Sequence, residues 1–190
     1  AGFKLDMVPE KAASVIDKTN FVFLMAPVYH SAMRFAGPVR GVLGVKTIMN
    51  LLGPLTNPAE AKYLMLGVYS TTVLEPFTKA AKALGAKRVM VAISDDGYDE
   101  ISLTGSFKIV YNEEEHVYQP EEFGMQVINP KEIYGGSTLE DAKEIFDAVL
   151  ENRSTLAQKN VVLINSAFAI HVIEQQKTFN ECLSLAKESL

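Results

Sequence analysis

The chain has 190 residues, 48% hydrophobic and 22% charged, which is typical of a globular domain large enough to bury its own core. Its 18 basic and 23 acidic side chains give a formal charge of −5, which argues against a nucleic-acid surface. One cysteine, Cys182, excludes an internal disulfide and favours a reducing compartment. No apolar run of the roughly 18 residues that a membrane helix needs and no signal peptide are visible, so we expect a cytoplasmic protein without a membrane partner.

The first expected elements are a helix and a buried strand. Residues 1–20 predict a short helix that is entered at Pro9, because the fixed φ of proline suits the first helical turn. Residues 21–25 are aromatic and aliphatic without alternation, which predicts a strand that is buried on both faces.

The stretch that follows, residues 26–58, combines basic side chains with small and apolar ones. Four basic side chains fall within seventeen residues: His30, Arg34, Arg40 and Lys46. Proline disfavours helix in the residue before it, so Gly37-Pro38 and Gly53-Pro54 predict corners between short elements. Short helices are expected around residues 28–36, 38–43 and 47–52. Cationic side chains among rigid corners are typical of a pocket that receives an anion.

A strand–helix–strand unit comes next. Residues 63–69 and 88–93 predict buried strands, and residues 72–84 predict a helix that ends at Gly85. This order predicts a parallel pair with a right-handed crossover. Because ligands bind beyond the carboxyl ends of such strands, we expect the 26–58 stretch and the acidic turn that follows residue 93 to face one another across a substrate.

The chain then changes to shorter β segments. Residues 100–118 are divided by Gly105 and by a turn at 112–115, which predicts a small antiparallel meander. Residues 120–124 predict one helical turn. The elements together predict an α/β fold with a central, largely parallel sheet flanked by helices and a small antiparallel β meander.

Two capping-box patterns mark the last helices. Ser137–Glu140 predicts the start of a helix to about Glu151, and Thr178–Glu181 predicts the start of the final helix. Residues 155–175, between them, are apolar nearly all round and predict a buried helix. The inner face of the first helix is expected to carry Leu139, Ala142, Ile145, Phe146 and Val149.

Arg40 is the first candidate for binding an anion. Its planar guanidinium matches a carboxylate or phosphate with two parallel hydrogen bonds, and it lies between a proline corner and Gly41. The alternative is a surface arginine in an ion pair. His30 lies just after the predicted strand at residues 21–25. It can bind an anion, act as a neutral hydrogen-bond partner or cap local backbone.

Asp99 and Glu100 are the candidate metal ligands. Adjacent side chains on a regular strand point to opposite faces, so the two can share one ligand only in a turn, and Gly97 supplies a turn. Two carboxylates held in this way suit Mg²⁺, which prefers oxygen ligands, keeps several waters and bridges to phosphates. The alternative is an acidic surface turn without a ligand.

Several other kinds of site have no sequence signal in these 190 residues. There is no glycine-rich loop of the P-loop or dinucleotide kind, no nucleophile elbow and no zinc-ligand spacing. The residues above can therefore hold an acidic small molecule and a metal, but they offer no evident grip on a phosphate chain.

Three runs of sequence carry a family resemblance. They are A-P-V-Y-H-S-A-M-R from residue 26, P-V-R-G-V-L-G-V-K-T-I-M-N-L-L-G-P-L-T-N-P from residue 38, and D-G-Y-D-E from residue 96. With them, nearly the whole chain resembles the catalytic α/β domain of the anthranilate phosphoribosyltransferase family. The resemblance implies the fold of nucleoside phosphorylase and phosphoribosyltransferase catalytic domains. It also implies a glycosyltransferase that moves a phosphoribosyl group from phosphoribosyl pyrophosphate to anthranilate in tryptophan biosynthesis.

The resemblance also implies roles for five residues. Arg40 would bind the anthranilate carboxylate, Pro54 would line the aromatic ring, and His30 would lie near the anthranilate channel. Asp99 and Glu100 would hold Mg²⁺ under the pyrophosphate. No residue is implied as an acid or a base, because an aromatic amine is already neutral at pH 7 and the reaction needs positioning and charge neutralisation instead.

In that family the glycine-rich pyrophosphate loop and most of a small helical domain lie upstream of the residue that Ala1 matches. We therefore expect residues 1–190 to be a single α/β catalytic domain and a fragment of a longer chain, inactive by itself. The complete protein would be a homodimer through the missing N-terminal helices.

Two other functions are compatible with the fold that the resemblance implies. A nucleic-acid-binding paralogue is disfavoured by the acidic balance and by the presence of Arg40, Asp99 and Glu100. A pyrimidine-nucleoside phosphorylase is disfavoured because the G-P-L-T-N-P run fits the anthranilate enzymes better.

Overall fold

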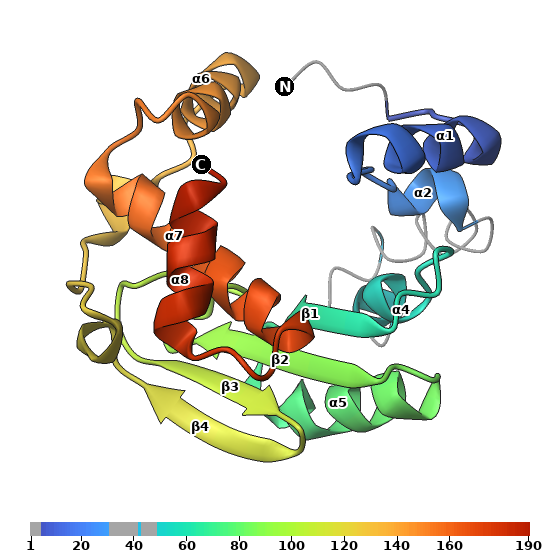
Figure 1. Cartoon of the computed structure of the whole chain (residues 1–190), viewed down its shortest axis with the longest axis horizontal. Coiled ribbons are helices and arrows are strands. Elements are labelled where there is room, and N and C mark those ends of the chain that lie inside the picture. The colour runs from blue at the N-terminus through green and yellow to red at the C-terminus, as the bar shows by residue number, and fades with distance from the viewer. Residues whose placement is uncertain (1–4, 31–41, 43–48) are drawn as a thin grey trace. The chain divides into compact units, whose positions relative to one another are not determined.

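The computed structural model describes residues 5–30, 42 and 49–190, and it divides the chain into two compact units, residues 1–60 and 61–190 (Figure 1). The first unit contains the helices α1 (Pro9–Thr19), α2 (Ala26–Tyr29) and α4 (Met49–Leu55). As predicted, α1 has proline in its first turn. It ends at Asn20, whose φ of 57° is the left-handed conformation that commonly closes a helix.

The expected strand at residues 21–25 is wrong for the structure described. The segment has no regular secondary structure, and Phe21 and Phe23 are 59% and 54% exposed. A strand is stabilised by hydrogen bonds to a neighbour, and no described strand pairs with this segment. The apolar character of residues 21–25 therefore predicts a buried strand, but among the described residues no strand pairs with this segment and its two phenylalanines are exposed.

The corner expected at Gly53-Pro54 is also wrong, because α4 continues through it to Leu55. Pro54 lacks the N–H that would close one helical hydrogen bond, but it lies in the last turn, where few such bonds remain to be lost. The corner at Gly37-Pro38 lies outside the described residues, and of the helix expected at 38–43 only residue 42 is described, in helical conformation. Of the helix expected at 28–36, the structure describes only the beginning, within α2.

The second unit is built on a four-stranded sheet in the order β1 (Tyr63–Gly67), β2 (Arg88–Ser94), β3 (Phe107–Tyr111) and β4 (Glu114–Tyr118). The strands β1 and β2 are parallel, whereas the pairs β2–β3 and β3–β4 are antiparallel. The predicted α/β class is confirmed, and the described sheet is mixed, with one parallel pair.

The predicted βαβ unit is confirmed, and its helix covers one face of the sheet. A short 3₁₀ turn, η1 (Thr71–Val73), leads into α5 (Leu74–Ala83), which packs on β2 and β3. Gly85 has a φ of 96°, and its N–H donates to Lys82 O while the next N–H donates to Ala81 O. This pattern is a Schellman motif, so the glycine ends the helix as its sequence predicts.

The other face of the sheet is covered by α7 (Leu156–Ile173) and α8 (Phe179–Glu188), which also pack on each other (Figure 1). Alternate residues of β2 serve the two faces, and Met90 and Ala92 belong to the core beneath these helices. Phe107, Ile164 and Phe168 are buried in the same core, which also contains the fully buried Cys182.

The helix α7 is buried along one side only, so the prediction of all-round burial is only partly met. By length and hydropathy it would pass for a membrane span, contrary to the expectation that no segment would. A core helix passes the same test, and α7 packs on β1, β2 and α8. Arg88 of β2 donates hydrogen bonds to the last carbonyls of α7, at Val172 and Ile173, and so caps it.

The hairpin of β3 and β4 confirms the antiparallel part of the predicted meander. Its two-residue turn places Asn112 and Glu113 at φ values of 51° and 74°, as in a type I′ turn. Residues 101–105, expected as a further β segment, are not a strand. The predicted helical turn is a 3₁₀ helix, η2 (Pro120–Phe123), and a second one follows as η3 (Pro130–Ile133).

The helix α6 (Leu139–Leu150) begins one residue later than predicted. Its capping box pairs Thr138 with Asp141, not Ser137 with Glu140. The expected inner face is also wrong, because of those five residues only Val149 is buried, while Leu139 is 78% and Phe146 42% exposed. The box of α8 at Thr178 and Glu181 is as predicted.

Candidate functional site

The acidic turn at residues 95–100 follows directly on the carboxyl end of β2. Gly97, at a φ of 92°, lets the chain reverse: its N–H donates to Ser94 O at 2.9 Å, and the Ser94 N–H donates to Tyr98 O at 3.0 Å. The turn therefore returns Asp99 and Glu100 to the end of the sheet, the place where ligands of α/β sheets bind.

Ser94 and Asn165 fix the backbone that carries these carboxylates. The Ser94 hydroxyl donates to Glu100 O at 2.6 Å and accepts from the Ser102 N–H at 3.0 Å. The Asn165 side chain, from α7, hydrogen-bonds to both the N–H and the carbonyl of Ile101. Backbone groups on both sides of the pair are thus tied to the sheet and to a core helix.

Gly67, the last residue of β1, allows the turn to lie against the strand. A Cβ placed on Gly67 would lie 1.6 Å from Asp99 O and 2.7 Å from Asp99 C. No side chain fits in that space, so the backbone of Asp99 requires glycine at the end of the neighbouring strand.

A cavity of about 370 Å³ opens beside the carboxylates. Asp99 and Glu100 lie on one side of it, and Asn165 and Ser166 of α7 contribute further polar side chains. Its remaining lining comes from the two parallel strands and from α7: Met65, Leu66, Gly67, Ala92 and Ala169. Gly67, Ala92 and Ala169 have little or no side chain, which leaves space for the cavity, and Asp99 and Glu100 are its acidic groups.

The two carboxylates interact with each other. The pKa of Glu100 is raised from 4.5 to about 7, first by partial burial, then by its hydrogen bond to Asp99 and by the charges of Asp99 and Asp96. Glu100 therefore keeps its proton to a higher pH than an ordinary glutamate, because its pKa is raised. A divalent cation relieves the same repulsion.

The geometry fits a cation of the Mg²⁺ type. Mg²⁺ is commonly bound through one or two carboxylates, with water and phosphate oxygens completing its shell. Among the described residues no cluster of three or more acidic, histidine or cysteine side chains forms a complete protein cage. Asp99 and Glu100 would therefore hold the ion as a pair, open on the cavity side.

The other two acids of the turn are used for structure. The Asp96 carboxylate accepts hydrogen bonds from the hydroxyls of Ser102 and Thr104, and the Asp95 carboxylate accepts one from Ser106. Both carboxylates are thus engaged in hydrogen bonds to hydroxyls near the turn, which distinguishes them from the pair at 99 and 100.

A second cavity, of about 280 Å³, lies within the first unit. His30 and Pro54, which the sequence singles out separately, both line it, together with Leu24, Ala26, Tyr29, Gly53, Asn57 and Pro58. The structure therefore brings these two predicted residues together. Arg40 lies outside the described residues.

The orientation of His30 is set by Thr56. The Thr56 hydroxyl donates its one proton to Leu52 O at 2.8 Å, and His30 Nε2 lies 3.2 Å from the same oxygen. With the hydroxyl proton placed on Leu52 O, this contact fits a neutral His30 that donates from Nε2. In the neutral imidazole Nδ1 is then an acceptor.

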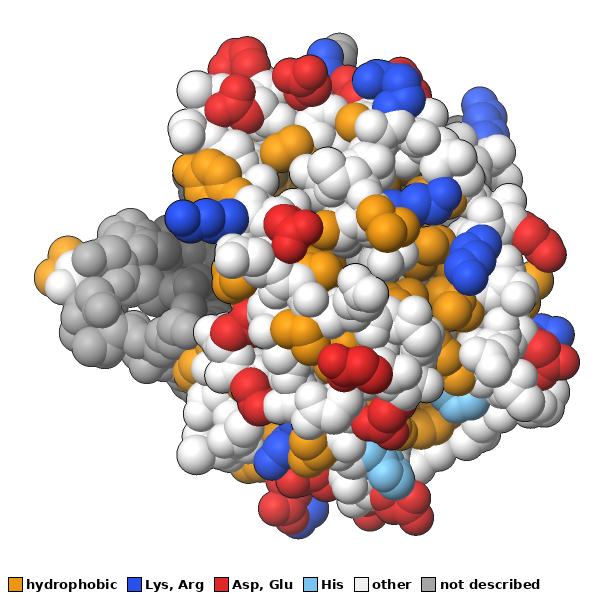
Figure 2. All heavy atoms as spheres, turned by 90° about the vertical axis from the view of Figure 1, so that its left-hand side faces the viewer, with side chains coloured by type: hydrophobic (Ala, Val, Ile, Leu, Met, Phe, Trp, Pro, Cys, Tyr) orange, Lys and Arg blue, Asp and Glu red, His pale blue; other side chains and the backbone are white. Residues whose placement is uncertain are grey.

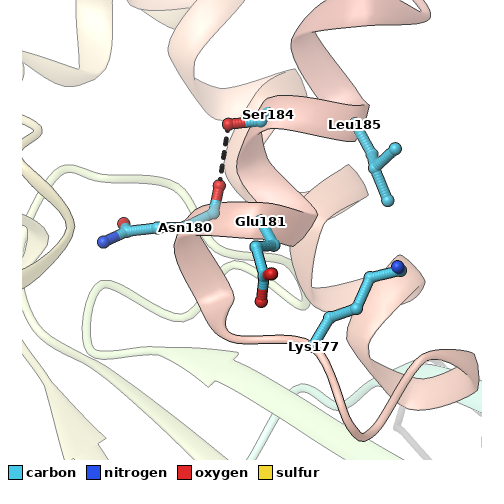
Figure 3. Close-up of a pocket in the computed structure, with 5 residues that line it drawn as sticks. All are labelled: Lys177, Asn180, Glu181, Ser184 and Leu185. Carbon is cyan, nitrogen blue, oxygen red and sulfur yellow. Dashed lines mark hydrogen bonds between the residues drawn. The ribbon is translucent and has the colours of Figure 1, made fainter.

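A third pocket, at the start of α8, is a structural feature of that helix (Figure 3). Of its lining residues, Glu181 is engaged in the capping box with Thr178, and the Ser184 hydroxyl donates to Asn180 O at 3.0 Å. Lys177 and Leu185 complete the lining, and the polar groups that the helix end engages are not available to a ligand.

Sequence reasoning missed Gly67, Ser94 and Asn165. A glycine after an apolar strand was a usable signal for a close backbone approach at Gly67. Asn165 gave no local signal, because its partner Ile101 lies 64 residues away in the chain, and the bonds of Ser94 depend on how the turn folds back on the strand.

Comparison with known families matches residues 1–190 to the model described as glycosyl transferase family, a/b domain. The anthranilate phosphoribosyltransferase of Phocaeicola vulgatus is 42% identical over 189 residues, which cover 100% of this chain and 57% of that protein. That of Persephonella marina is 38% identical over 193 residues, with the same coverage of 100% and 57%. The chain thus spans little more than half the length of these relatives.

Solved structures with this fold carry the same name. Anthranilate phosphoribosyltransferase from Thermus thermophilus superposes with a TM-score of 0.90 at 34% identity, over 100% of this chain and 56% of that one. The Saccharomyces cerevisiae enzyme in complex with PRPP and Mg gives a TM-score of 0.86 at 24% identity, over 99% and 54%. The fold expected from the family resemblance is confirmed.

Proposed function

The chain belongs to the glycosyl transferase family through an α/β domain that matches all of its residues, and on this basis we propose that the complete protein is an anthranilate phosphoribosyltransferase. It would transfer the phosphoribosyl group of phosphoribosyl pyrophosphate to anthranilate in tryptophan biosynthesis. The observation that carries the proposal is the Asp99–Glu100 pair at the end of the parallel strands, in a chain 42% identical to a relative of that name.

The activity is proposed for the complete protein, because the chain spans only 57% of that relative. Residues 1–190 would form its single α/β catalytic domain and would be inactive by themselves. The complete protein would be a cytoplasmic homodimer.

The reaction joins the anthranilate nitrogen to the anomeric carbon of the ribose. The nitrogen lone pair forms the new C–N bond, the C–O bond to pyrophosphate breaks with its electron pair on oxygen, and the amine loses a proton to solvent. An aromatic amine is neutral near pH 7, so no strong base is needed, and the protein contributes orientation and electrostatic stabilisation.

Asp99 and Glu100 would hold Mg²⁺ at the pyrophosphate. A cation held by these two residues would supply neutralisation of the charge that develops on the leaving group. Ser94 and Asn165 hydrogen-bond to the backbone of Glu100 and Ile101, Gly67 leaves room for Asp99, and the two carboxylates line a cavity that would receive phosphate oxygens.

The acceptor would be bound by Arg40, His30 and Pro54. The Arg40 guanidinium would pair with the anthranilate carboxylate, a fork-to-fork contact that fixes the plane of the acid. Pro54 would offer an apolar ring to the aromatic face, and His30, whose Nε2 contacts Thr56, would offer Nδ1 as an acceptor toward the amine. These residues orient the nucleophile and do not take its proton.

The alternative of a nucleic-acid-binding paralogue is not favoured. On the face shown in Figure 2, acidic and basic side chains are interspersed over the described residues, without a continuous basic area. The formal charge of −5 acts in the same direction. We propose that the protein has neither nucleic-acid nor membrane partners.

Arg40→Ala in the full-length protein tests the proposal. We expect the KM for anthranilate to rise by far more than the KM for phosphoribosyl pyrophosphate, because a charge-assisted contact worth about 1.5–3 kcal/mol is lost. The assay is pyrophosphate release with each substrate varied in turn. Equal effects on the two KM values would show that Arg40 is structural, and absence of turnover with anthranilate in the unchanged protein would reject the function itself.

A further inference from the structure

The side chain of Asn165 makes three hydrogen bonds, all of them to backbone groups. Its Nδ2 donates to Ile101 O at 2.8 Å and to Val161 O at 2.8 Å, and its Oδ1 accepts from the Ile101 N–H at 3.1 Å. The two bonds to Ile101 reproduce the paired bonds that a neighbouring strand would make with that residue.

The place of this contact matters because Ile101 directly follows Glu100. Ile101 and Ser102 are buried, and Ile101 is not part of a strand, so its N–H and carbonyl need another partner. Asn165 supplies that partner from the middle of a core helix. The same asparagine lines the cavity into which Asp99 and Glu100 open.

We infer that Asn165 is a positioning residue for the metal-binding carboxylates Asp99 and Glu100, an inference that rests on the proposed function. Two like charges on adjacent residues repel each other, and a short turn would relax by moving them apart. The bonds from Asn165 to Ile101 oppose that movement on the C-terminal side of the pair. Gly67 has no side chain, so the backbone of Asp99 can lie directly against the end of β1. The folded protein therefore keeps the two carboxylates close together, against their electrostatic repulsion, before a cation binds.

The test measures cation affinity directly and does not use turnover. Full-length protein is titrated with Mn²⁺ alone, and the free ion is followed by its electron paramagnetic resonance signal. We expect Asn165→Ala and Asn165→Leu each to weaken Mn²⁺ binding by roughly tenfold or more, as loss of groups that orient metal ligands commonly does. The leucine variant fills the space of the asparagine, so it keeps the helix packed even if the alanine variant does not fold.

Leu163→Ala is the matched control, because Leu163 lies on the same helix and is buried in the core without a polar contact to the turn. It should lower the melting temperature and leave Mn²⁺ affinity unchanged. Amide exchange at Ile101 should quicken in both Asn165 variants and not in the control.

The outcomes separate the two claims. If the unchanged protein binds Mn²⁺ and both Asn165 variants bind it equally well, the positioning role is overturned and the proposed metal site stands. If the unchanged protein binds no Mn²⁺, the metal site fails and the role of Asn165 fails with it.

Discussion

At the scale of single residues, the turn after β2 divides four acids into two kinds. Asp95 and Asp96 accept hydrogen bonds from nearby hydroxyls and stabilise the turn, whereas Asp99 and Glu100 face a cavity and each other. Asp95 and Asp96 also lie beside Gly97 in the sequence, and the structure shows how their contacts differ from those of Asp99 and Glu100. Their partners decide which carboxylates remain available to a cation.

Replacing both candidate ligands, Asp99→Asn with Glu100→Gln, should raise the Mg²⁺ concentration for half-maximal rate by roughly tenfold or more, since the neutral amides bind Mg²⁺ poorly. The measurement is a Mg²⁺ titration of pyrophosphate release by the full-length protein. Asp95→Asn is the control, because that carboxylate is already bonded within the turn. Identical titrations of the double variant and the unchanged protein would exclude the pair as ligands.

The raised pKa of Glu100 has a consequence for stability. A carboxyl whose folded-state pKa is about 7 instead of 4.5 holds its proton more tightly in the folded protein than in the unfolded chain. The contribution of Glu100 to the free energy of unfolding is therefore fully present below pH 4.5, and it is lost as the pH rises from 4.5 to about 7. Without divalent cations, Glu100→Gln should gain melting temperature relative to the unchanged protein between about pH 5 and pH 8.

Thermal unfolding in buffer with a chelator checks this, and only the difference between the two proteins is read, since other groups titrate in both. A difference that does not vary with pH would show that Glu100 has an ordinary pKa. Addition of Mg²⁺ at the higher pH should reduce the difference.

At the scale of elements, the close packing of β1 against the acidic turn depends on one missing side chain. Gly67→Ala would place a Cβ 1.6 Å from Asp99 O, so the turn or the strand must move. We expect a loss of about 1–3 kcal/mol of unfolding free energy, as for other overpacked sites, together with weaker Mg²⁺ binding. Denaturant unfolding and metal titration measure the two effects.

Gly105→Ala serves as its control, because nothing lies within 4 Å of a Cβ at that position. Its unfolding free energy should stay within about 0.5 kcal/mol of the unchanged protein. If the two glycine variants behave alike, the close approach of Asp99 to β1 does not limit the site.

Elements whose signal is local could be predicted from the sequence, and elements that depend on distant partners could not. Proline at the start of α1, the glycine after α5 and the capping box of α8 each act within a few residues, and all three are as predicted. The segment 21–25 and the apolar side of α6 were assigned burial from composition, but burial depends on a neighbour that composition does not reveal.

The same distinction applies to the candidate site. The acidic pair was identified because two carboxylates and a glycine lie next to each other in the sequence. Asn165 was not, because its role arises from a contact across 64 residues of chain. Gly67 lies on β1 and acquires its role only when the turn after β2 folds over it.

At the scale of the whole molecule, the principal core of the described residues lies within the second unit. The buried members of this core, from Met90 to Ala186, and the partly buried residues packed against them all belong to residues 61–190, as do the sheet and its covering helices. A polypeptide of residues 61–190 should therefore fold by itself, because it is large enough to bury a core and retains this one intact.

A cooperative thermal transition and well-dispersed amide resonances of residues 61–190 would confirm this. A broad, non-cooperative transition would show that the first unit is needed to complete the core. Residues 1–60, of which no described residue belongs to the cluster, are the comparison and should show the weaker transition.

The burial of Cys182 between the last two helices gives the protein an internal reporter. The thiol is fully buried, burial raises its pKa, and its sulfur lies 4.0 Å from Nδ1 of His171 on α7. It therefore stays protonated and shielded from alkylating reagents as long as α8 remains in place. Since the chain has no other cysteine, the rate at which iodoacetamide labels Cys182 reports how often α8 separates from α7. No engineered probe is required.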